Sequence, residues 1–414
     1  MQPGEEREVR ARLERFLEDV LRPVGRRDRR NWGKVYVRGL VEDGGRRTAA
    51  EMARRLPDGD EQALQQFVGQ SPWAHEPVRK ELALRMVGLL SPRVAWVVDD
   101  TGFPKKGKHS VGVARQYSGT LGKIGNCQVG VSLNYATDDA CVPLDFSLYL
   151  PKEWTEDRER CGKAGVPEDV MFKTKWQLAL EMIDRALSWG VPPGVVVADS
   201  GYGKVAEFRK GLQDRELSYV VGVDQDTGVW AEEVRVARPA YQGRGRPRTR
   251  IRTLPRPQSV LEVAKGLPQS AWQAVTWREG TKGPMTGRFA CLRVQPSHAW
   301  AEGKVEHPVV WLLVEWPPEA DKPTKFWLSN LGVDTTLPEL VRLAKIRWWV
   351  EQNYQQMKEE LGLDHYEGRS WRGWHHHVTL TMIAFCFLVA ESLLHKKNFW
   401  VWEGLPTVDD TPSA

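Results

Sequence analysis

Two short apolar runs, each closed by an aspartate, constrain the fold of this chain more than any other feature. The run at residues 93–99 closes on Trp-Val-Val-Asp99, and the run at residues 194–199 reads Gly-Val-Val-Val-Ala-Asp199. Runs this short and this apolar are typical of strands buried on both faces of a sheet. We therefore expect an α/β fold in which Asp99 and Asp199 stand at the carboxyl ends of two buried strands.

The segments around these runs alternate between strand and helix patterns. Further strands are expected at residues 128–136, 142–150 and 217–223, and helices at residues 174–189 and 204–213. The resulting order is three strands, then helix, strand, helix and strand. Because this is the ribonuclease-H-like order, we expect a ribonuclease-H-like mixed sheet with flanking helices.

The first 90 residues have helical spacing throughout. Helices are expected at residues 5–24, from Thr48 onward, at 61–68 and at 76–90. Pro23 and the basic run at 26–30 end the first helix, and Thr48 with Glu51 fits a capping box. Short helices with basic residues between them are typical of a helix-turn-helix-like DNA-binding domain. A helical packing or dimerisation module explains the pattern equally well.

The segment from 225 to 330 has a different pattern, with strands expected at 273–278, 288–294, 309–315 and 325–328. We interpret it as a β-rich insertion.

Within this insertion, arginines alternate along an acid-free stretch. Arg244 and Arg248 flank a Gly-Arg-Pro core centred on Arg246 that resembles an AT-hook. Such a segment binds a narrow, A·T-rich minor groove. A solvated basic linker is the equally weighted alternative.

A helix beginning near Pro338, or the helix that follows it, carries a mixed charged face. Arg347 and Glu351 are four residues apart, and Lys358 lies seven residues further, so all three share one side. Trp348 lies directly after the arginine. The arrangement would let the two cations bind backbone phosphates on either side of a carboxylate that binds a metal ion. A surface helix with ordinary ion pairs explains the same spacing.

The composition describes a soluble globular protein. The 414 residues are 41% hydrophobic and 27% charged, and the net charge of +5 favours a polyanionic partner. Five scattered cysteines without a C-x-x-C pair argue against a disulfide framework or zinc ribbon, so we expect a reducing cytoplasm. The start of the chain has no apolar signal segment. The longest apolar run, residues 378–390, is too short to span a bilayer, so we expect a buried helix and no membrane partner.

Three carboxylates in these positions suit two-metal phosphodiester chemistry. Such chemistry needs oxygen ligands that hold two divalent cations about 3.5–4 Å apart, and these ligands favour Mg²⁺ or Mn²⁺. Lys105 and Lys106 follow Asp99 closely, which suggests phosphate beside metal. Either aspartate alone is explained as well by a helix cap or a turn. For the three histidines at 375–377 we favour a structural or solvent role.

Three pieces of the chain together match one family. They are Val-Val-Asp99-Asp-Thr-Gly-Phe-Pro-Lys-Lys-Gly, Val-Val-Ala-Asp199-Ser-Gly-Tyr-Gly and Arg347-x3-Glu351-x6-Lys358. With them the chain resembles the DDE transposases of bacterial insertion sequences, in the branch whose signature is Y-x2-R-x3-E-x6-K. Ala344 departs from that signature by replacing the tyrosine. The pieces span residues 93–365, and only their combination is specific.

The resemblance implies roles for individual residues. It assigns two Mg²⁺ ions, with Mn²⁺ as a substitute, to the catalytic residues Asp99, Asp199 and Glu351. Asp99 is preferred to Asp100 because the family's motif reads D-x-T. The resemblance also assigns Arg347 and Lys358 to the DNA backbone near the cleaved end. Trp348 stands where relatives place an aromatic beside a flipped base.

The resemblance also implies an organisation and an activity. The expected parts are a helical DNA-binding domain at 1–90, a catalytic domain at 91–224 and 331–395, the insertion at 225–330 and a tail at 396–414. The implied activity is cut-and-paste transposition through hairpin ends. The implied partner is double-stranded DNA, at element ends and target, bound by a homodimer in the bacterial cytoplasm at the nucleoid.

Two other functions fit parts of the pattern. A ribonuclease-H-like nuclease would cut without joining the ends to target DNA. A non-catalytic DNA-binding regulator would use the helical N-terminus and the arginine stretch, but it has no need of three carboxylates.

Overall fold

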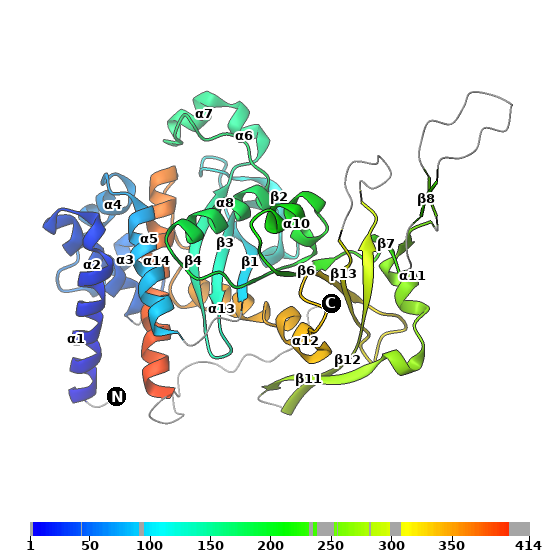
Figure 1. The fold of residues 1–414 in the computed structure, drawn as a ribbon. Helices are drawn as coiled ribbons and strands as arrows, with labels where there is room; N and C mark the ends of the chain where they lie inside the picture. The colour runs from blue at the N-terminus through cyan, green and yellow to red at the C-terminus, as the bar shows by residue number, and fades with distance from the viewer. Residues whose placement is uncertain are drawn as a thin grey trace.

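The computed structural model describes residues 3–42, 44–90, 95–231, 235–237, 252–254, 256–280, 283–298 and 308–396. A large mixed sheet forms the centre of this part, and helices cover it (Figure 1). The predicted α/β class with a mixed sheet is therefore confirmed.

The N-terminal part is helical, as the sequence predicts. Its elements are α1 (Pro3–Val20), η1 (Arg22–Val24), α2 (Arg27–Val41), α3 (Ala49–Arg55), α4 (Glu61–Gly69) and α5 (His75–Leu89). The prediction missed α2, because the basic run that ends the first helix also forms the first turn of the next. Thr48 caps α3 by accepting a hydrogen bond from the Glu51 backbone N–H. The Glu51 carboxylate pairs with Arg54, outside the predicted capping box.

The central strands and helices follow the predicted order with additions. They are β1 (Ala95–Pro104), β2 (Ala114–Ser118), η2 (Gly119–Leu121), β3 (Lys123–Ala136), β4 (Cys141–Tyr149), α6 (Lys152–Glu156), α7 (Arg158–Lys163), α8 (Lys175–Ser188), β5 (Val195–Ala198), α9 (Ser200–Gly203), α10 (Ala206–Gln213) and β6 (Tyr219–Val223). The prediction missed β2, which has only five residues and forms a hairpin with β3.

The register of β1 and β5 brings the two predicted aspartates together. The two strands are parallel, and their last pair joins Val98 to Ala198. Asp99 and Asp199 are thus the first residues beyond the same pair, on strands about 4.8 Å apart. The prediction that β1 ends at Asp99 is wrong, since antiparallel pairing with β3 extends β1 to Pro104.

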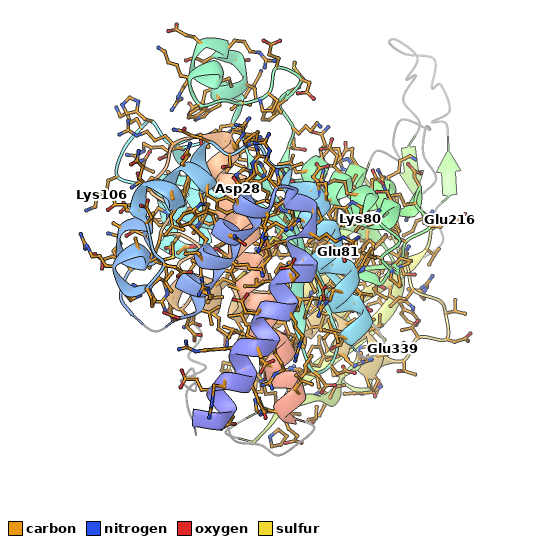
Figure 2. The ribbon with its side chains drawn as sticks, turned by 90° about the vertical axis from the view of Figure 1, so that its left-hand side faces the viewer. Asp28, Lys80, Glu81, Lys106, Glu216 and Glu339 are labelled. Carbon is orange, nitrogen blue, oxygen red and sulfur yellow. The ribbon has the colours of Figure 1, made fainter. Side chains whose placement is uncertain are left out.

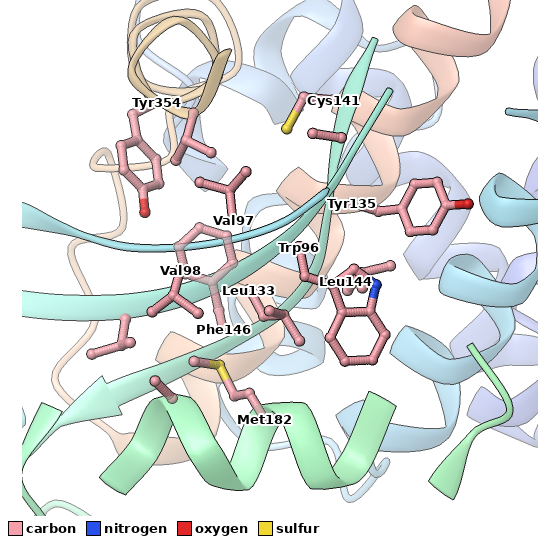
Figure 3. Close-up of a cluster of buried hydrophobic side chains, with 14 of the residues drawn as sticks. Trp96, Val97, Val98, Leu133, Tyr135, Cys141, Leu144, Phe146, Met182 and Tyr354 are labelled. Atoms are coloured by element: carbon pink, nitrogen blue, oxygen red, sulfur yellow. The ribbon is translucent and has the colours of Figure 1, made fainter. Parts of the chain in front are cut away.

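The main core lies between these strands and the covering helices. Figure 3 shows Trp96 and Val98 of β1, Leu133 of β3 and Phe146 of β4 around Met182 of α8, and all of them are buried. The alternation of side chains across β1 explains how Trp96 and Val98 reach the same layer. This packing holds the strand that carries Asp99.

The β-rich segment continues the central sheet. Its elements are β7 (Gly228–Trp230), β8 (Arg235–Ala237), β9 (Arg252–Leu254), β10 (Gln258–Ser259), α11 (Val260–Lys265), η3 (Gln269–Ala271), β11 (Gln273–Gly280), β12 (Gly283–Pro296), β13 (Val310–Glu315) and β14 (Lys325–Ser329). The strand order is β10-β7-β12-β13-β14-β6-β5-β1-β3-β2, with β11 on β12 and β4 on β3. Because β14 pairs with β6, most strands of the segment form one sheet with the central strands, whereas β8 and β9 pair with each other in a separate two-stranded sheet.

Three helices complete the described chain: α12 (Leu337–Lys345), α13 (Trp348–Glu359) and α14 (Trp371–Lys396). By length and composition, α14 could cross a membrane, with a mean hydropathy of 1.8. However, 67% of its apolar window is buried inside the protein, against α1, α2, α4, α5 and β4 (Figure 1). This burial is typical of the core helix of a soluble protein.

The three consecutive histidines lie on α14 and are buried. His377 is held on both sides: the Tyr36 hydroxyl donates to its Nδ1, and its Nε2–H donates to the Gly362 carbonyl, both at 2.9 Å. His376 lies between the carbonyls of Val68 and Trp73. These residues therefore join α14 to the N-terminal helices.

The environment of His377 makes stability depend on pH. Burial lowers the pKa of His377 from 6.5 to about 4. Between these values the unfolded chain binds a proton that the folded chain does not, so stability falls as the pH falls. We expect the Tm to drop between pH 6.5 and pH 4, with about 3 kcal/mol of the change from this side chain.

Calorimetry at fixed ionic strength measures this effect. His377→Gln should reduce the drop, whereas His109→Gln, at an exposed position, should leave it unchanged. A Tm that stays constant over this range in the wild-type protein would contradict the prediction.

Candidate active site

The helix that carries Glu351 begins at a bend held in place by an ion pair. Lys345 ends α12, and its Nζ lies 2.6 and 2.7 Å from the two carboxylate oxygens of Glu315 on β13. The rings of Trp277, Phe289 and Trp327 lie 4.6 to 5.8 Å from the same ammonium. The ion pair fixes the chain two residues before Arg347. Sequence reasoning missed it, because no local pattern links positions 315 and 345.

Arg347 joins two of the predicted metal ligands. Its Nη1 lies 2.6 Å from Oδ2 of Asp99, and its Nη2 lies 2.5 Å from Oε1 of Glu351. The Asp99 side chain is 10% exposed and that of Glu351 is 59% exposed. The signature arginine, predicted to contact DNA, thus bridges a buried carboxylate of β1 and an exposed carboxylate of α13.

The charges of the site act on one another. Burial raises the pKa of Asp99 to about 7, the nearby Arg347 opposes this rise, and the carboxylates of Asp199 and Asp100 add to it. Burial alone would lower the pKa of Arg347, but the attraction of Asp99, Glu351 and Asp199 raises it above its ordinary value. The guanidinium of Arg347 is therefore attracted electrostatically by all three carboxylates that were predicted as metal ligands.

The three carboxylates do not form a ready-made metal site in this conformation. Within the described ranges, no three histidine, cysteine, aspartate or glutamate side chains are grouped closely enough to hold an ion. The cation of Arg347 lies between Asp99 and Glu351 instead. The donor set still fits a divalent ion, since it consists of hard carboxylate oxygens around a position already occupied by positive charge.

Asp100 is held separately on the other side of β1. Its carboxylate accepts hydrogen bonds from Lys175 Nζ at 3.0 Å and from the Tyr202 hydroxyl at 3.1 Å. Tyr202 follows Asp199 closely and is buried. These contacts, which the sequence did not reveal, engage Asp100 with its own partners and leave Asp99 to face Arg347.

Lys358 points into the protein. Its Nζ donates to the Gly102 carbonyl at 2.9 Å and to Thr120 Oγ1 at 2.7 Å. Burial lowers the pKa of Lys358 to about 8, although Asp364 opposes this. The residue predicted to contact DNA thus ties the end of α13 to β1 and to the turn after β2.

The two tryptophans of α13 differ in their surroundings. Trp349 packs against the hydrophobic core, as expected of at least one of the pair. Trp348 is half-buried and stacks on Trp349, with ring centroids 4.3 Å apart. The guanidinium carbon of Arg278 lies 3.5 Å from the Trp348 ring centroid. Trp348 therefore links α13 to β11.

The remaining predicted DNA contacts differ in position. Lys105 donates to the Tyr366 carbonyl at 2.7 Å, so its ammonium is bound within the protein. Lys106 is exposed at the outer edge of the molecule (Figure 2). Arg244, Arg246 and Arg248 lie outside the described residues.

Comparison with known proteins identifies the family. Residues 19–284 match the model of the DDE superfamily endonucleases. The chain belongs to this family. The matched range contains Asp99 and Asp199 and ends before Glu351. A probable transposase for insertion sequence element IS701 from Microchaete diplosiphon is 25% identical over 329 residues, which cover 78% of this chain and 73% of the relative. The resemblance to DDE transposases of insertion sequences is thereby confirmed.

Removing the guanidinium should destabilise the site. In Arg347→Met, Asp99 loses its counterion, and the loss of one partner of a buried pair costs about 3 kcal/mol. The pKa of Asp99 should then rise further, so the folded protein would hold this proton to higher pH than the unfolded chain. Stability should therefore fall as the pH rises, and more steeply than in the wild type.

Chemical denaturation at several pH values measures both effects. Arg342→Met is the matched control, because Arg342 pairs with Asp138 on the exposed surface, where a pair contributes about 1 kcal/mol or less. Equal losses in the two variants would contradict the assigned role of Arg347.

Proposed function

We propose that this chain is a DNA transposase that cleaves the ends of its insertion sequence and joins the freed 3′-OH ends to target DNA. The observation that supports this most is the bridge of Arg347 between Asp99 and Glu351, with Asp199 at the end of the strand beside Asp99, within a chain of the DDE family. A non-catalytic DNA-binding regulator would have no use for such a set.

The carboxylates of Asp99, Asp199 and Glu351 would hold two Mg²⁺ ions, or Mn²⁺ in their place, which supply an activated water and stabilise the leaving oxygen. Arg347 has to leave Asp99 and Glu351 when this happens. A DNA phosphate is the anion that would receive its guanidinium, since arginine binds phosphate with two parallel hydrogen bonds. The bridge in the DNA-free protein supports this exchange.

The proposed reaction has four steps. Water cuts one strand at the element's end and frees a 3′-OH. That hydroxyl attacks the opposite strand and forms a hairpin, hydrolysis reopens it, and the 3′-OH then attacks target DNA. Trp348 would stack on the base that leaves the helix during hairpin formation. Its ring stacks with Trp349 and lies under the guanidinium of Arg278, so one of these contacts would have to open to admit the base.

The partners and setting are part of the proposal. The chain would act as a homodimer on paired element ends, with the helical part at 1–90 and the arginine stretch as further DNA contacts. It would act in the bacterial cytoplasm, at the nucleoid. All five cysteines are free, which supports a reducing compartment.

Asp199 provides a direct test of the cleavage step. Asp199→Ala should abolish nicking of DNA that carries the element with its own flanks, because a metal ligand is lost, and should leave binding of this DNA largely intact. Gel analysis of strand breaks and joined products measures the outcome. Asp214→Ala is the control, since Asp214 is exposed and pairs with Lys210. Cleavage that survives in Asp199→Ala would refute the assignment, and cleavage without joining in the wild type would favour a nuclease.

Metal binding can be tested without DNA. Adding Mg²⁺ to the metal-free protein should raise the Tm, since the ion binds only the folded carboxylates. Asp199→Ala should lose most of this rise. Arg347→Met should show a larger rise than the wild type, because no guanidinium competes for Asp99 and Glu351. A rise that is the same in all three proteins would place the ion elsewhere.

A further inference from the structure

The segment directly after the Asp99 motif is unusually basic. From Thr101 to Thr137 the chain contains no aspartate or glutamate, but it contains Lys105, Lys106, Lys108, Arg115 and Lys123. This segment forms the end of β1, the loop after it and the β2–β3 hairpin. This stretch, which follows the Asp99 motif directly, therefore contributes no acidic side chain of its own.

Most of these cations have no acidic partner. Lys106, Lys108, Arg115 and Lys123 are exposed, and none of them forms an ion pair within the part of the chain that the structure describes. Exposed lysines elsewhere are often neutralised, as Lys163 is by Glu159. The hairpin and its neighbouring loop thus present positive charge that the protein itself does not neutralise.

The hairpin also exposes an apolar pair. Tyr117 of β2 lies opposite Ile124 of β3, and opposite residues of an antiparallel pair point to the same face. Tyr117 is 64% exposed and Ile124 is 60% exposed. Arg115 lies two residues before Tyr117 and therefore on the same face. An exposed aromatic ring beside an unpaired arginine is the combination that binds single-stranded nucleic acid.

The hairpin is tied to both elements of the active site. Thr120, in its turn, accepts a hydrogen bond from Lys358 of α13 at 2.7 Å. The same ammonium binds the carbonyl of Gly102, three residues beyond Asp99 on β1. The hairpin therefore lies beside the strand that carries Asp99 and the helix that carries Glu351.

We propose that the β2–β3 hairpin binds unpaired DNA next to the cleavage site, with Tyr117 stacked on a base and with Arg115 and Lys123 on flanking phosphates. The inference rests on the proposed function, and it names the surface that would hold the separated strand. Positive charge and the absence of acids favour a polyanion over a protein surface. The exposed ring favours unpaired bases over an intact duplex.

A binding experiment with two DNAs tests this inference. A short blunt duplex of mixed sequence is compared with the same duplex carrying non-complementary bases at one end, both labelled with a fluorophore. Anisotropy is measured with EDTA present, so that no cleavage occurs. Tyr117→Ala should weaken binding of the frayed DNA about 5-fold to 100-fold and should barely change binding of the blunt DNA. Tyr117→Phe keeps the ring and should bind both DNAs as the wild type does.

The proposed phosphate contacts are tested separately, by the salt dependence of DNA binding. Arg115→Gln combined with Lys123→Gln should weaken binding of both DNAs and reduce the slope of log K against log salt by up to about 2. Lys163→Gln combined with Lys210→Gln removes two exposed cations that already have acidic partners, so it should change the slope little.

Two results would overturn the inference. One is an unchanged ratio of the two affinities in Tyr117→Ala. The other is a shift of the oligomeric state in Tyr117→Ala with DNA binding intact, which would make the hairpin a protein interface. A wild-type protein that binds frayed DNA through Tyr117 but never cleaves would instead refute the proposed function and leave this inference standing.

Discussion

The guanidinium of Arg347 is the interaction on which the candidate site depends. It hydrogen-bonds to Asp99 on β1 and to Glu351 on α13, and it lies in the field of Asp199 beyond β5. Neighbouring carboxylates repel one another unless a cation lies among them. The arginine supplies that cation between Asp99 and Glu351, so it offsets the repulsion between these acidic side chains.

The helix that presents Glu351 is anchored at both ends. The Lys345–Glu315 ion pair fixes its beginning against β13, and the contacts of Lys358 with Gly102 and Thr120 fix its end against β1 and the hairpin. Between these anchors the Tyr354 hydroxyl hydrogen-bonds to Ser132 of β3 at 2.6 Å, and Asn353 donates to the Cys141 carbonyl of β4 at 3.1 Å. The Glu351 carboxylate itself is bound by Arg347. The helix can therefore stay in place while this bridge exchanges its partners.

Much of this arrangement could be predicted from local sequence signals. The apolar runs before Asp99 and Asp199, and the cap at Thr48, depend on neighbouring residues only, and they predicted β1, β5 and the start of α3, although β1 continues beyond Asp99 to Pro104. The helix α2 and the short strand β2 lack such signals. The family motif predicts Asp99, Asp199 and Glu351 as site residues, but it could not show that Arg347 stands between two of them. That contact joins residues 248 positions apart, and its geometry arises only from packing.

The continuity of the sheet has a mechanical consequence. Because β14 pairs with β6, and β6 in turn with β5 and β1, the β-rich segment is not a separate body on a flexible tether. A force applied to its outer strands is transmitted through the hydrogen-bonded neighbouring strands as a change in the twist of the sheet. It thereby reaches the strands that precede Asp99 and Asp199. A force on the outer strands would thus change the twist on which the spacing of the two aspartates depends.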